Sequence, residues 1–337
     1  MSDAPLIEIK NLSVRFPTED GVVNAVSDVS LNLSRGESVG IVGESGSGKS
    51  VTWLTVMGLT DRTRAQVDGE VLFEGTDLLK LPETELQAIR GRRISMIFQD
   101  PMTSLHPYYK VGAQIAEAVR AHKDVSKAEA WNRAVEMLRL VAIPQPERRA
   151  LQYPHEFSGG MRQRAMIAMA LALDPAVLIA DEPTTALDVT VQAQILELIA
   201  RLREELGTAV VMITHDLGVV AEYCDRIAVM YAGRVVEEGT GRDVYYGAQH
   251  PYAWGLLRSI SRLDDAPDAR LTPIKGLPPS LIHVPSGCAF HPRCPYVFDR
   301  CRTEVPVLAT TEGIHAAACH LAIDDRKRIF SEEVARR

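Results

Sequence analysis

The chain has 337 residues, of which 46% are hydrophobic, so it is long enough for one large domain or two modest ones with a sizeable core. Its 37 Lys and Arg residues against 44 Asp and Glu residues give a net charge of −7, which argues against a general nucleic-acid binder, because such proteins are usually basic. No stretch has the pattern of a signal peptide. Asp174 and Pro175 divide the most apolar region, residues 165–180, so we expect no segment that crosses a bilayer.

Hydrophobic periodicity predicts strands and helices that alternate along the first 250 residues. The expected strands are residues 6–16, 23–33, 37–43, 70–75, 176–182, 209–216 and 226–233. The expected helices are residues 51–59, most of 111–143, 161–173 and 192–206, the last of them stopped by Gly207. This alternation predicts an α/β fold with a mostly parallel sheet.

The composition and hydrophobic pattern of the sequence change near residue 250. HPYAWGLLRSI, residues 250–260, is predicted to be a short helix. Residues 262–285 contain five prolines and are expected to form an extended linker. A cysteine-bearing tail follows the linker, so the chain is expected to carry an extension after its α/β part.

The stretch GESGSGKS, residues 43–50, fits the pattern G-x-x-x-x-G-K-[ST] of phosphate-binding loops. The glycines allow backbone N–H groups to turn inward around phosphate oxygens, and the next helix points its N-terminus at the same place. Lys49 would supply a charge for the β- and γ-phosphates, and Ser50 a hydroxyl for Mg²⁺. The alternative is a glycine-rich turn that ends in a helix cap, but a strand before the loop and a helix after it favour the phosphate loop.

Two adjacent carboxylates, Asp181 and Glu182, end a predicted apolar strand. Two adjacent negative charges at a strand end cost free energy unless a cation lies beside them, and a nucleotide-bound Mg²⁺ is such a cation. Asp181 would then hold the water shell of the metal, while Glu182 would orient or deprotonate the attacking water. The alternative, a plain surface turn, is disfavoured by the phosphate loop.

Three further polar sites follow predicted strands or begin a predicted helix. FSGGMRQR, residues 157–164, puts Ser158 and two glycines at the start of a helix, where backbone N–H groups and a hydroxyl could form a second anion site. If this motif is considered alone, a simple Ser N-cap is the better interpretation. His215 could contact a γ-phosphate, although a lone histidine is more often structural. Gln99 could meet both a metal and a water, and is otherwise an ordinary polar strand end.

These motifs, in this order, resemble those of the ATPase subunits of ABC transporters over about residues 5–250. The resemblance implies an α/β P-loop nucleotide-binding domain with a RecA-like, mostly parallel sheet, an antiparallel β subdomain and a helical subdomain at about residues 100–165. It implies ATP and Mg²⁺ as ligands, Ser50, Gln99 and Asp181 at the metal, and Glu182, His215 and Gln99 as catalytic residues. Phe16 would stack on adenine, with a core residue as the alternative for this position. The other implied nucleotide contacts are Gly43, Glu44, Ser45, Gly46, Ser47, Gly48, Lys49, Ser50, Gln99, Ser158, Gly159, Gly160, Asp181 and Asp188.

A narrower resemblance joins the chain to the ATPases of bacterial oligopeptide and dipeptide importers. It rests on MIFQDPMTSLHP, LIADEPTTALDVTVQAQIL, YAGRVVEEG, HPYAWGLL and the cysteine-bearing tail, and it places a domain boundary at residue 250, before an extension at 251–337. Phe157 and Met161 depart from the Leu and Gln of the family signature, but the Ser and Gly residues between them are kept, so we expect a working signature. The resemblance does not name the cargo.

The same resemblance implies a set of partners and a location. The partners would be a second, related ATPase subunit in a head-to-tail heterodimer, two membrane permease subunits and an extracytoplasmic substrate-binding protein. The permeases would be reached through residues 100–109 and the helical subdomain. The chain would lie on the cytoplasmic face of the bacterial inner membrane and bind no nucleic acid.

Two alternatives invoke nucleic acid: a soluble ABC ATPase that acts on DNA or ribosomes, and a zinc-bound nucleic-acid module in the tail. The first usually carries a long coiled-coil insertion or two ATPase domains, and neither is present in this sequence. Between residues 276 and 320 the three arginines are balanced by three acidic residues, so the tail has no basic footprint.

Four of the five cysteines lie in the last fifty residues: Cys288, Cys294, Cys301 and Cys319. Their spacing, C-x5-C-x6-C-x17-C, predicts a metal centre that staples a segment too short to fold alone, because disulfides fit poorly with a cytosolic ATPase. The spacing leaves [4Fe–4S] and Zn²⁺ open, with His291, His315 or His320 as substitute zinc ligands. The importer resemblance favours the [4Fe–4S] cluster.

Overall fold

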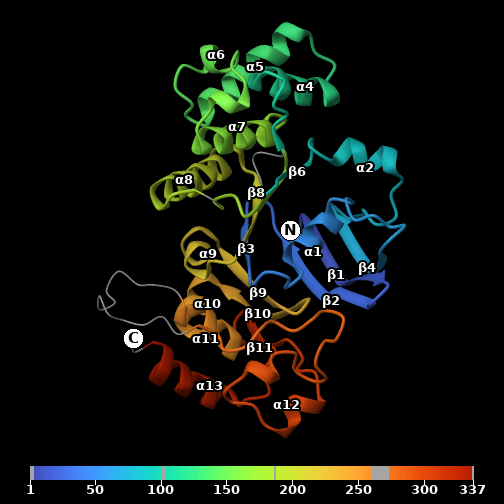
Figure 1. The fold of residues 1–337 in the computed structure, drawn as a ribbon, viewed down its shortest axis with the longest axis vertical. Coiled ribbons are helices and arrows are strands. Elements are labelled where there is room, and N and C mark those ends of the chain that lie inside the picture. Colours follow the sequence, from blue (N-terminus) through green and yellow to red (C-terminus); the bar gives the residue numbers. More distant parts are fainter. Residues whose placement is uncertain (1–3, 100–103, 186, 260–272, 336–337) are drawn as a thin grey trace. The chain divides into compact units, whose positions relative to one another are not determined.

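The computed structural model describes residues 4–99, 104–185, 187–259 and 273–335 (Figure 1). The chain divides into two compact units. Unit 1 comprises Met1–Leu33, Ser38–Leu79 and Thr214–Arg337, and unit 2 comprises Ser34–Glu37 and Lys80–Ile213. The chain therefore leaves unit 1 and returns to it, and the tail after residue 273 belongs to the same unit as the N-terminus.

Unit 1 contains a four-stranded antiparallel sheet in the order β2-β1-β4-β5. In β1, Ile7 and Ile9 are buried in alternation with more exposed residues, and Leu12 and Val14 continue the alternation after a register shift, as expected for a strand with one face against a core. The strands are β1 (Ile7–Thr18), β2 (Gly21–Leu33), β4 (Gln66–Phe73) and β5 (Thr76–Asp77).

The remaining strands of unit 1 run in the order β3-β9-β10-β12-β11. The pair β3 (Ser38–Val42) and β9 (Arg226–Tyr231) is parallel, whereas β10 (Arg234–Thr240), β12 (His315–Ala317) and β11 (Ala309–Glu312) join it antiparallel. The last two strands come from the tail, so the extension continues the sheet. The helices of unit 1 are α1 (Lys49–Val56), α9 (Leu217–Tyr223), α10 (Gly241–Gly247), α11 (Pro251–Arg258), η2 (His291–Arg293), α12 (Asp299–Thr303), α13 (Ile323–Ile329) and η3 (Phe330–Val334).

Unit 2 combines three parallel strands with most of the long helices. The strands β6 (Ile94–Ile97), β7 (Val177–Asp181) and β8 (Ala209–Thr214) pair in that order and are buried throughout, as in parallel sheets covered on both faces. The helices are α2 (Glu83–Ile89), α4 (Val111–His122), α5 (Lys127–Leu140), α6 (Pro146–Arg149), η1 (Pro154–Glu156), α7 (Gly159–Leu171) and α8 (Val189–Leu206).

The predicted α/β class is confirmed, and each long predicted element has a counterpart. The helical region 111–143 is two helices, because Ser126 and Glu129 form a capping box that starts α5. Gly207 ends α8 in the left-handed conformation, as predicted. The sequence patterns missed several short elements, among them α2, α9, α10, α12, α13, β10, β11 and β12. Residues 100–103 and 260–272, which include the start of the predicted permease-facing segment and much of the predicted linker, lie outside the described residues.

Gly48, which precedes α1, generates the first prediction. Its φ is +98°, and a Cβ at this position would lie 2.4 Å from the Ala25 carbonyl oxygen and 3.2 Å from the Gly233 Cα. Gly48→Ala should therefore lower the free energy of unfolding by roughly 1–3 kcal/mol, because both the backbone conformation and the space disfavour a side chain. Urea denaturation without nucleotide measures the change.

Gly247→Ala is the matched control. Gly247 lies in α10, and no atom stands within 4 Å of the position that its Cβ would take, so this variant should be as stable as the parent or slightly more so. Equal denaturation midpoints for the Gly48→Ala variant and the parent would contradict the expectation.

Candidate nucleotide site and cysteine-lined pocket

The predicted phosphate loop lies between the buried strand β3 and the N-terminus of α1. Gly46 and Gly48 have φ values of +77° and +98°, which glycine adopts without strain and which turn successive N–H groups to one side. Ser45 and Gly46 are exposed, and Ser50 is half-buried in the first turn of α1. The loop therefore has the local form that phosphate binding requires.

Lys49 is held inside this loop, with only 6% of its surface exposed. Its Nζ donates to the carbonyl oxygens of Gly43 at 2.6 Å and Glu44 at 3.0 Å, and to Ser47 Oγ at 3.4 Å. The loop oxygens hold the ammonium at the start of α1, where it can meet an anion.

Glu44 makes contacts that the sequence did not indicate. Its carboxylate accepts two hydrogen bonds from Arg293 of the tail, at 2.6 and 3.0 Å, and its N–H donates to the Tyr252 hydroxyl at 2.7 Å. No local pattern could have found them, because 249 residues separate Glu44 from Arg293.

Two other predicted residues of the site also belong to unit 1. Phe16 lies near the end of β1 opposite Val23 and is half-buried, so it is not one of the fully buried core residues. His215 is exposed and directly follows β8. Their contacts with nucleotide stay predictions.

Unit 2 brings the predicted catalytic carboxylate and glutamine together. Gln99 Nε2 donates to Glu182 Oε2 at 2.9 Å, and the Thr185 hydroxyl donates to the same oxygen at 2.8 Å. Asp181 is 7% exposed at the end of β7, and the Glu182 N–H donates to the Ile213 carbonyl oxygen at 2.8 Å. Glu182 has a φ of +45°, an uncommon conformation for a residue other than glycine. The two carboxylates thus occupy a tightly fixed strand end.

The predicted signature residues start α7. Ser158 is the N-cap and accepts from the Met161 N–H at 3.3 Å, while Ser158 and Gly159 are exposed and Gly160 is half-exposed. Asp188 is the exposed N-cap of α8 and accepts from the Val191 N–H at 3.0 Å. The cap interpretation and the anion-site interpretation are therefore compatible, because the helix start remains open to solvent.

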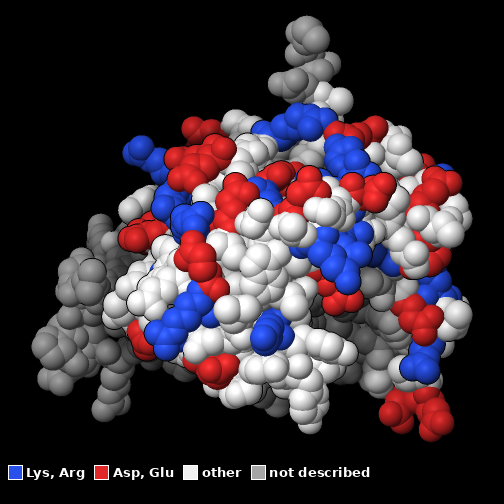
Figure 2. Space-filling model, turned by 90° about the horizontal axis from the view of Figure 1, so that it is seen from above, with Lys and Arg blue, Asp and Glu red and all other residues white. Residues whose placement is uncertain are grey.

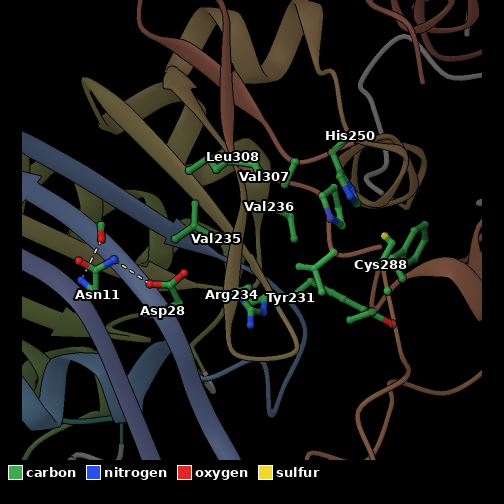
Figure 3. A pocket seen from close by; sticks show the side chains of 17 residues that line it. Asn11, Asp28, Tyr231, Arg234, Val235, Val236, His250, Cys288, Val307 and Leu308 are labelled. Carbon is green, nitrogen blue, oxygen red and sulfur yellow. Dashed lines mark hydrogen bonds between the residues drawn. The ribbon is translucent and has the colours of Figure 1, made fainter. Parts of the chain in front are cut away.

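The tail cysteines gather around one small pocket. Cys288, Cys294, Cys301 and Cys319 line a cavity of about 10 Å³ together with His250, His291 and His320. His315 lies elsewhere: its Nε2 is 2.7 Å from Glu237 Oε1 between β12 and β10. Next to this pocket, a larger one of about 440 Å³ is lined by Tyr231 of β9 and by Cys288 (Figure 3).

Comparison with protein families gives two matches. Residues 26–185 match the ABC transporter family, and residues 236–301 match the C-terminal region of oligopeptide/dipeptide transporters. The oligopeptide transport ATP-binding protein OppD of Salmonella typhimurium is 52% identical over 320 residues, 95% of each chain. The dipeptide transport ATP-binding protein DppD of Bacillus subtilis is 52% identical over 317 residues, 94% of each chain.

The chain belongs to the ATP-binding subunits of oligopeptide/dipeptide ABC transporters. As a member of this family it is an ATPase subunit whose hydrolysis of ATP drives peptide transport. A solved dimeric ATP-binding cassette in a post-hydrolysis state with ADP and Pi matches with a TM-score of 0.63 and 32% identity, over 70% of this chain and 99% of that one. The match supports the predicted ABC-type nucleotide-binding domain.

For a transporter subunit, the way it meets the membrane matters. Among the helices that the structure describes, none combines the length and the apolar character that a bilayer crossing needs.

The [4Fe–4S] cluster predicted for this ATPase subunit lacks a preformed ligand set. Four thiols suit a cluster or zinc chemically, but in the described ranges no three His, Cys, Asp or Glu side chains are arranged to hold a metal ion. The cavity of about 10 Å³ has room for roughly one water molecule. A four-iron cluster would therefore require the thiols to move apart.

Burial raises the pKa of three of these thiols, those of Cys288, Cys294 and Cys319. Burial is the main cause at Cys294, whose pKa rises to about 12, and at Cys319, whose pKa rises to about 11; the neighbouring cysteines add to both. The pKa of Cys288 is also raised, mainly by burial. These thiols are protonated at neutral pH unless a metal ion replaces their protons.

The raised thiol pKa values generate the second prediction. In metal-free folded protein at pH 8, Cys294 and Cys319 should react with iodoacetamide at least about a hundredfold more slowly than in the same chain unfolded in urea, because the thiolate is the nucleophile. Mass spectrometry of timed samples measures alkylation at each cysteine. Equal rates in the folded and unfolded chain would contradict the raised pKa values.

Proposed function

We propose that this subunit hydrolyses ATP with loop 43–50 as the phosphate site and Glu182 as the general base. The observation that carries the proposal is the hydrogen bond of Gln99 to Glu182, directly after the strand that presents Asp181. This hydrogen bond supports the proposal, because the amide that would bind the metal would then lie beside a carboxylate able to take a proton from water. The solved cassette that holds ADP and Pi supports the assignment of the ligand.

In the proposed binding mode, backbone N–H groups of the loop and the Lys49 ammonium hold the β- and γ-phosphates. Ser50, Gln99 and Asp181 provide the oxygen ligands, directly or through water, for Mg²⁺. When bound, Mg²⁺ neutralises charge that builds up on the phosphates. Phe16 offers a ring face to adenine, which needs only a π-surface for stacking.

In the proposed reaction, Glu182 orients a water molecule toward the γ-phosphorus and accepts its proton. The new oxygen–phosphorus bond forms as the bond to the bridging oxygen of ADP breaks, so the products are ADP and phosphate. Gln99 and Thr185 hold the Glu182 carboxylate in one orientation. His215 would contact the γ-phosphate from the end of β8.

The second half of each site would come from a related ATPase subunit. The exposed start of α7, with Ser158, Gly159 and Gly160, suits the γ-phosphate held by the loop of a partner, and Asp188 lies near the start of the following helix α8. A head-to-tail heterodimer would close when ATP binds and reopen after hydrolysis. The helical subdomain at about residues 100–165 belongs to the same proposal. So does the boundary in the sequence at residue 250, although the chain on both sides of it belongs to unit 1.

The importer would also contain two permease subunits and an extracytoplasmic substrate-binding protein, with this chain at the cytoplasmic face of the membrane. Relatives named for oligopeptide and dipeptide transport support peptide cargo. Tyr108 and Tyr109 in the proposed permease-facing segment are 82% and 58% exposed, which suits a docking surface.

The nucleic-acid alternative has no support in the charge distribution. On the face shown in Figure 2, basic and acidic side chains are mixed, and no broad basic patch is present among the side chains described there.

The third prediction concerns Glu182→Gln. This variant should bind ATP with unchanged affinity but lower the rate of hydrolysis by about 10²–10⁴-fold, because the amide cannot accept a proton from water. Phosphate release and ATP binding by the assembled transporter measure the two effects separately.

Lys49→Ala is the contrasting variant: it should lose ATP binding and with it peptide uptake, because the phosphates lose their cationic partner. Hydrolysis at the parent rate by Glu182→Gln would refute the proposed role of Glu182.

We further propose that the four tail cysteines ligate a metal centre, a [4Fe–4S] cluster by resemblance or otherwise Zn²⁺. Its support is that all four cysteines line one pocket and form no disulfide. The bound centre would hold together the tail segments that carry them. Cys301, the most buried of the four, lies in α12 and accepts the Cys288 N–H at its carbonyl oxygen, 2.9 Å away.

The fourth prediction tests this centre. Protein purified without oxygen should contain four irons and four sulfides per chain if the cluster forms, or one zinc if the site takes zinc, and absorbance and elemental analysis distinguish them. Cys301→Ser should lose the metal, whereas Cys224→Ser, at a buried cysteine outside the pocket, should keep it. Protein free of iron and zinc from every preparation would refute the centre.

A further inference from the structure

The Glu44–Arg293 ion pair joins the phosphate loop to the cysteine-bearing tail. Arg293 Nη1 donates to Glu44 Oε2 at 2.6 Å and Nη2 to Oε1 at 3.0 Å, a bidentate arrangement. The Arg293 side chain is 5% exposed and that of Glu44 is 28% exposed. Because the pair is largely shielded from water, removing one partner leaves the other charge poorly compensated.

The tail holds Arg293 in place for this contact. Its Nε donates to the Lys275 carbonyl oxygen at 3.1 Å, and Nη2 also reaches the Ile274 carbonyl oxygen at 3.4 Å. The guanidinium carbon lies 5.9 Å from the centre of the Tyr231 ring, and Nη1 is 3.4 Å from the Tyr231 hydroxyl. The guanidinium is therefore oriented before it meets Glu44.

Glu44, in turn, is fixed at all three of its polar groups. Its N–H donates to the Tyr252 hydroxyl, its carbonyl oxygen accepts from Lys49 Nζ, and its carboxylate accepts from Arg293. Two of these three partners come from the chain after residue 250. The position of Glu44, whose carbonyl oxygen accepts from Lys49 Nζ, thus depends on the chain after residue 250.

Arg293 belongs to the turn between two of the pocket cysteines. It ends the short helix η2, and Cys294 follows it directly, while the His291 N–H donates to the Cys288 carbonyl oxygen at 2.9 Å. Phe290 of the same turn packs edge-on against Tyr231, with 5.2 Å between ring centres. Figure 3 shows Tyr231 and Cys288 on the wall of the same pocket, so a displacement of the turn changes the surroundings of Arg293.

We propose that Arg293 is a positioning residue for the phosphate loop and that, through Glu44, the turn of Cys288 and Cys294 sets the affinity for ATP. The inference rests on the proposed function, since loop 43–50 must bind the phosphates. Arg293 acts in two ways: it fixes the backbone of Glu44, and it neutralises a carboxylate that would otherwise repel the phosphates nearby. The second effect can be separated from a purely structural one.

The fifth prediction is a double-mutant cycle in the assembled transporter. Arg293→Gln should raise the Kd for Mg-ATP and the KM for ATP about tenfold, with a smaller change in kcat, because the unpaired Glu44 carboxylate repels the phosphates. Arg293→Gln combined with Glu44→Gln should recover most of the affinity, because the repelling charge is gone. Arg293→Lys keeps the charge but loses the planar fork, so it should fall between the parent and Arg293→Gln.

Arg300→Gln is the matched control. Arg300 lies in the same tail and pairs with Glu304 on the surface, where both side chains are 57% exposed, so its loss should leave ATP affinity unchanged. Thermal melting of each variant separates a loss of affinity from a loss of fold. If Arg293→Gln does not fold, the cycle is built from Arg293→Lys and Glu44→Gln.

Two results would overturn the inference. One is a KM for ATP in Arg293→Gln equal to that of the parent. The other is an equal loss of ATP affinity in Arg293→Gln and in the double variant, because that result would mark a merely structural role. The proposed function fails separately, if the parent does not bind ATP or if Lys49→Ala binds it as well as the parent. The two failures are therefore distinguishable.

Discussion

The predicted phosphate loop, residues 43–50, cannot keep its shape by itself, and several distant segments of unit 1 support it. A loop that turns several N–H groups to one side needs glycines with positive φ, and glycine loses more conformational entropy on folding than any other residue. The surrounding chain offsets this cost. The Gly233 N–H donates to the Ser47 carbonyl oxygen at 3.0 Å, and the Ser27 N–H donates to the Gly233 carbonyl oxygen at 2.8 Å. The turn between β9 and β10 thereby connects β2 to the loop.

A buried carboxylate ties the extension to the same framework. Glu237 of β10 is completely buried and accepts hydrogen bonds from the N–H groups of Gln249 and His250, at 2.6 and 2.9 Å, with His315 Nε2 at 2.7 Å. Burial raises the pKa of Glu237, while these partners favour its charged form. One side chain thus joins β10, the start of α11 and the tail strand β12. The chain after residue 250 is consequently part of the core of unit 1, from which Tyr252 and Arg293 reach the phosphate loop.

Features of this protein that depend on local residue spacing could be predicted from the sequence, and features that depend on tertiary packing could not. The glycine-rich loop and the two carboxylates at the end of β7 could be singled out as site candidates, because the chemistry predicted for them requires particular residues at fixed local spacing. The α/β class was predictable from alternating periodicities. By contrast, Glu237 lies in a short strand with two acidic residues and gives no sign that it is buried. The contact of Glu44 with Arg293 and the strand β12 of three residues depend on tertiary packing, which leaves no periodic pattern. The cysteine spacing indicated a cluster of thiols but could not give the size of the pocket between them.

The two units hold their predicted site residues by different physical means. In unit 1, Lys49 is held by carbonyl and hydroxyl oxygens of its own loop, and the loop is supported from several distant segments. In unit 2, the order is local: β7 is buried along its whole length, and the chain must turn sharply as soon as it leaves the sheet. Glu182 adopts a φ of +45° at this turn, a strained conformation that its N–H bond to Ile213 and the side chains of Gln99 and Thr185 keep in place. A carboxylate fixed in this way would give up little further freedom on orienting a water molecule, so this strand end suits the role of general base that we propose for Glu182.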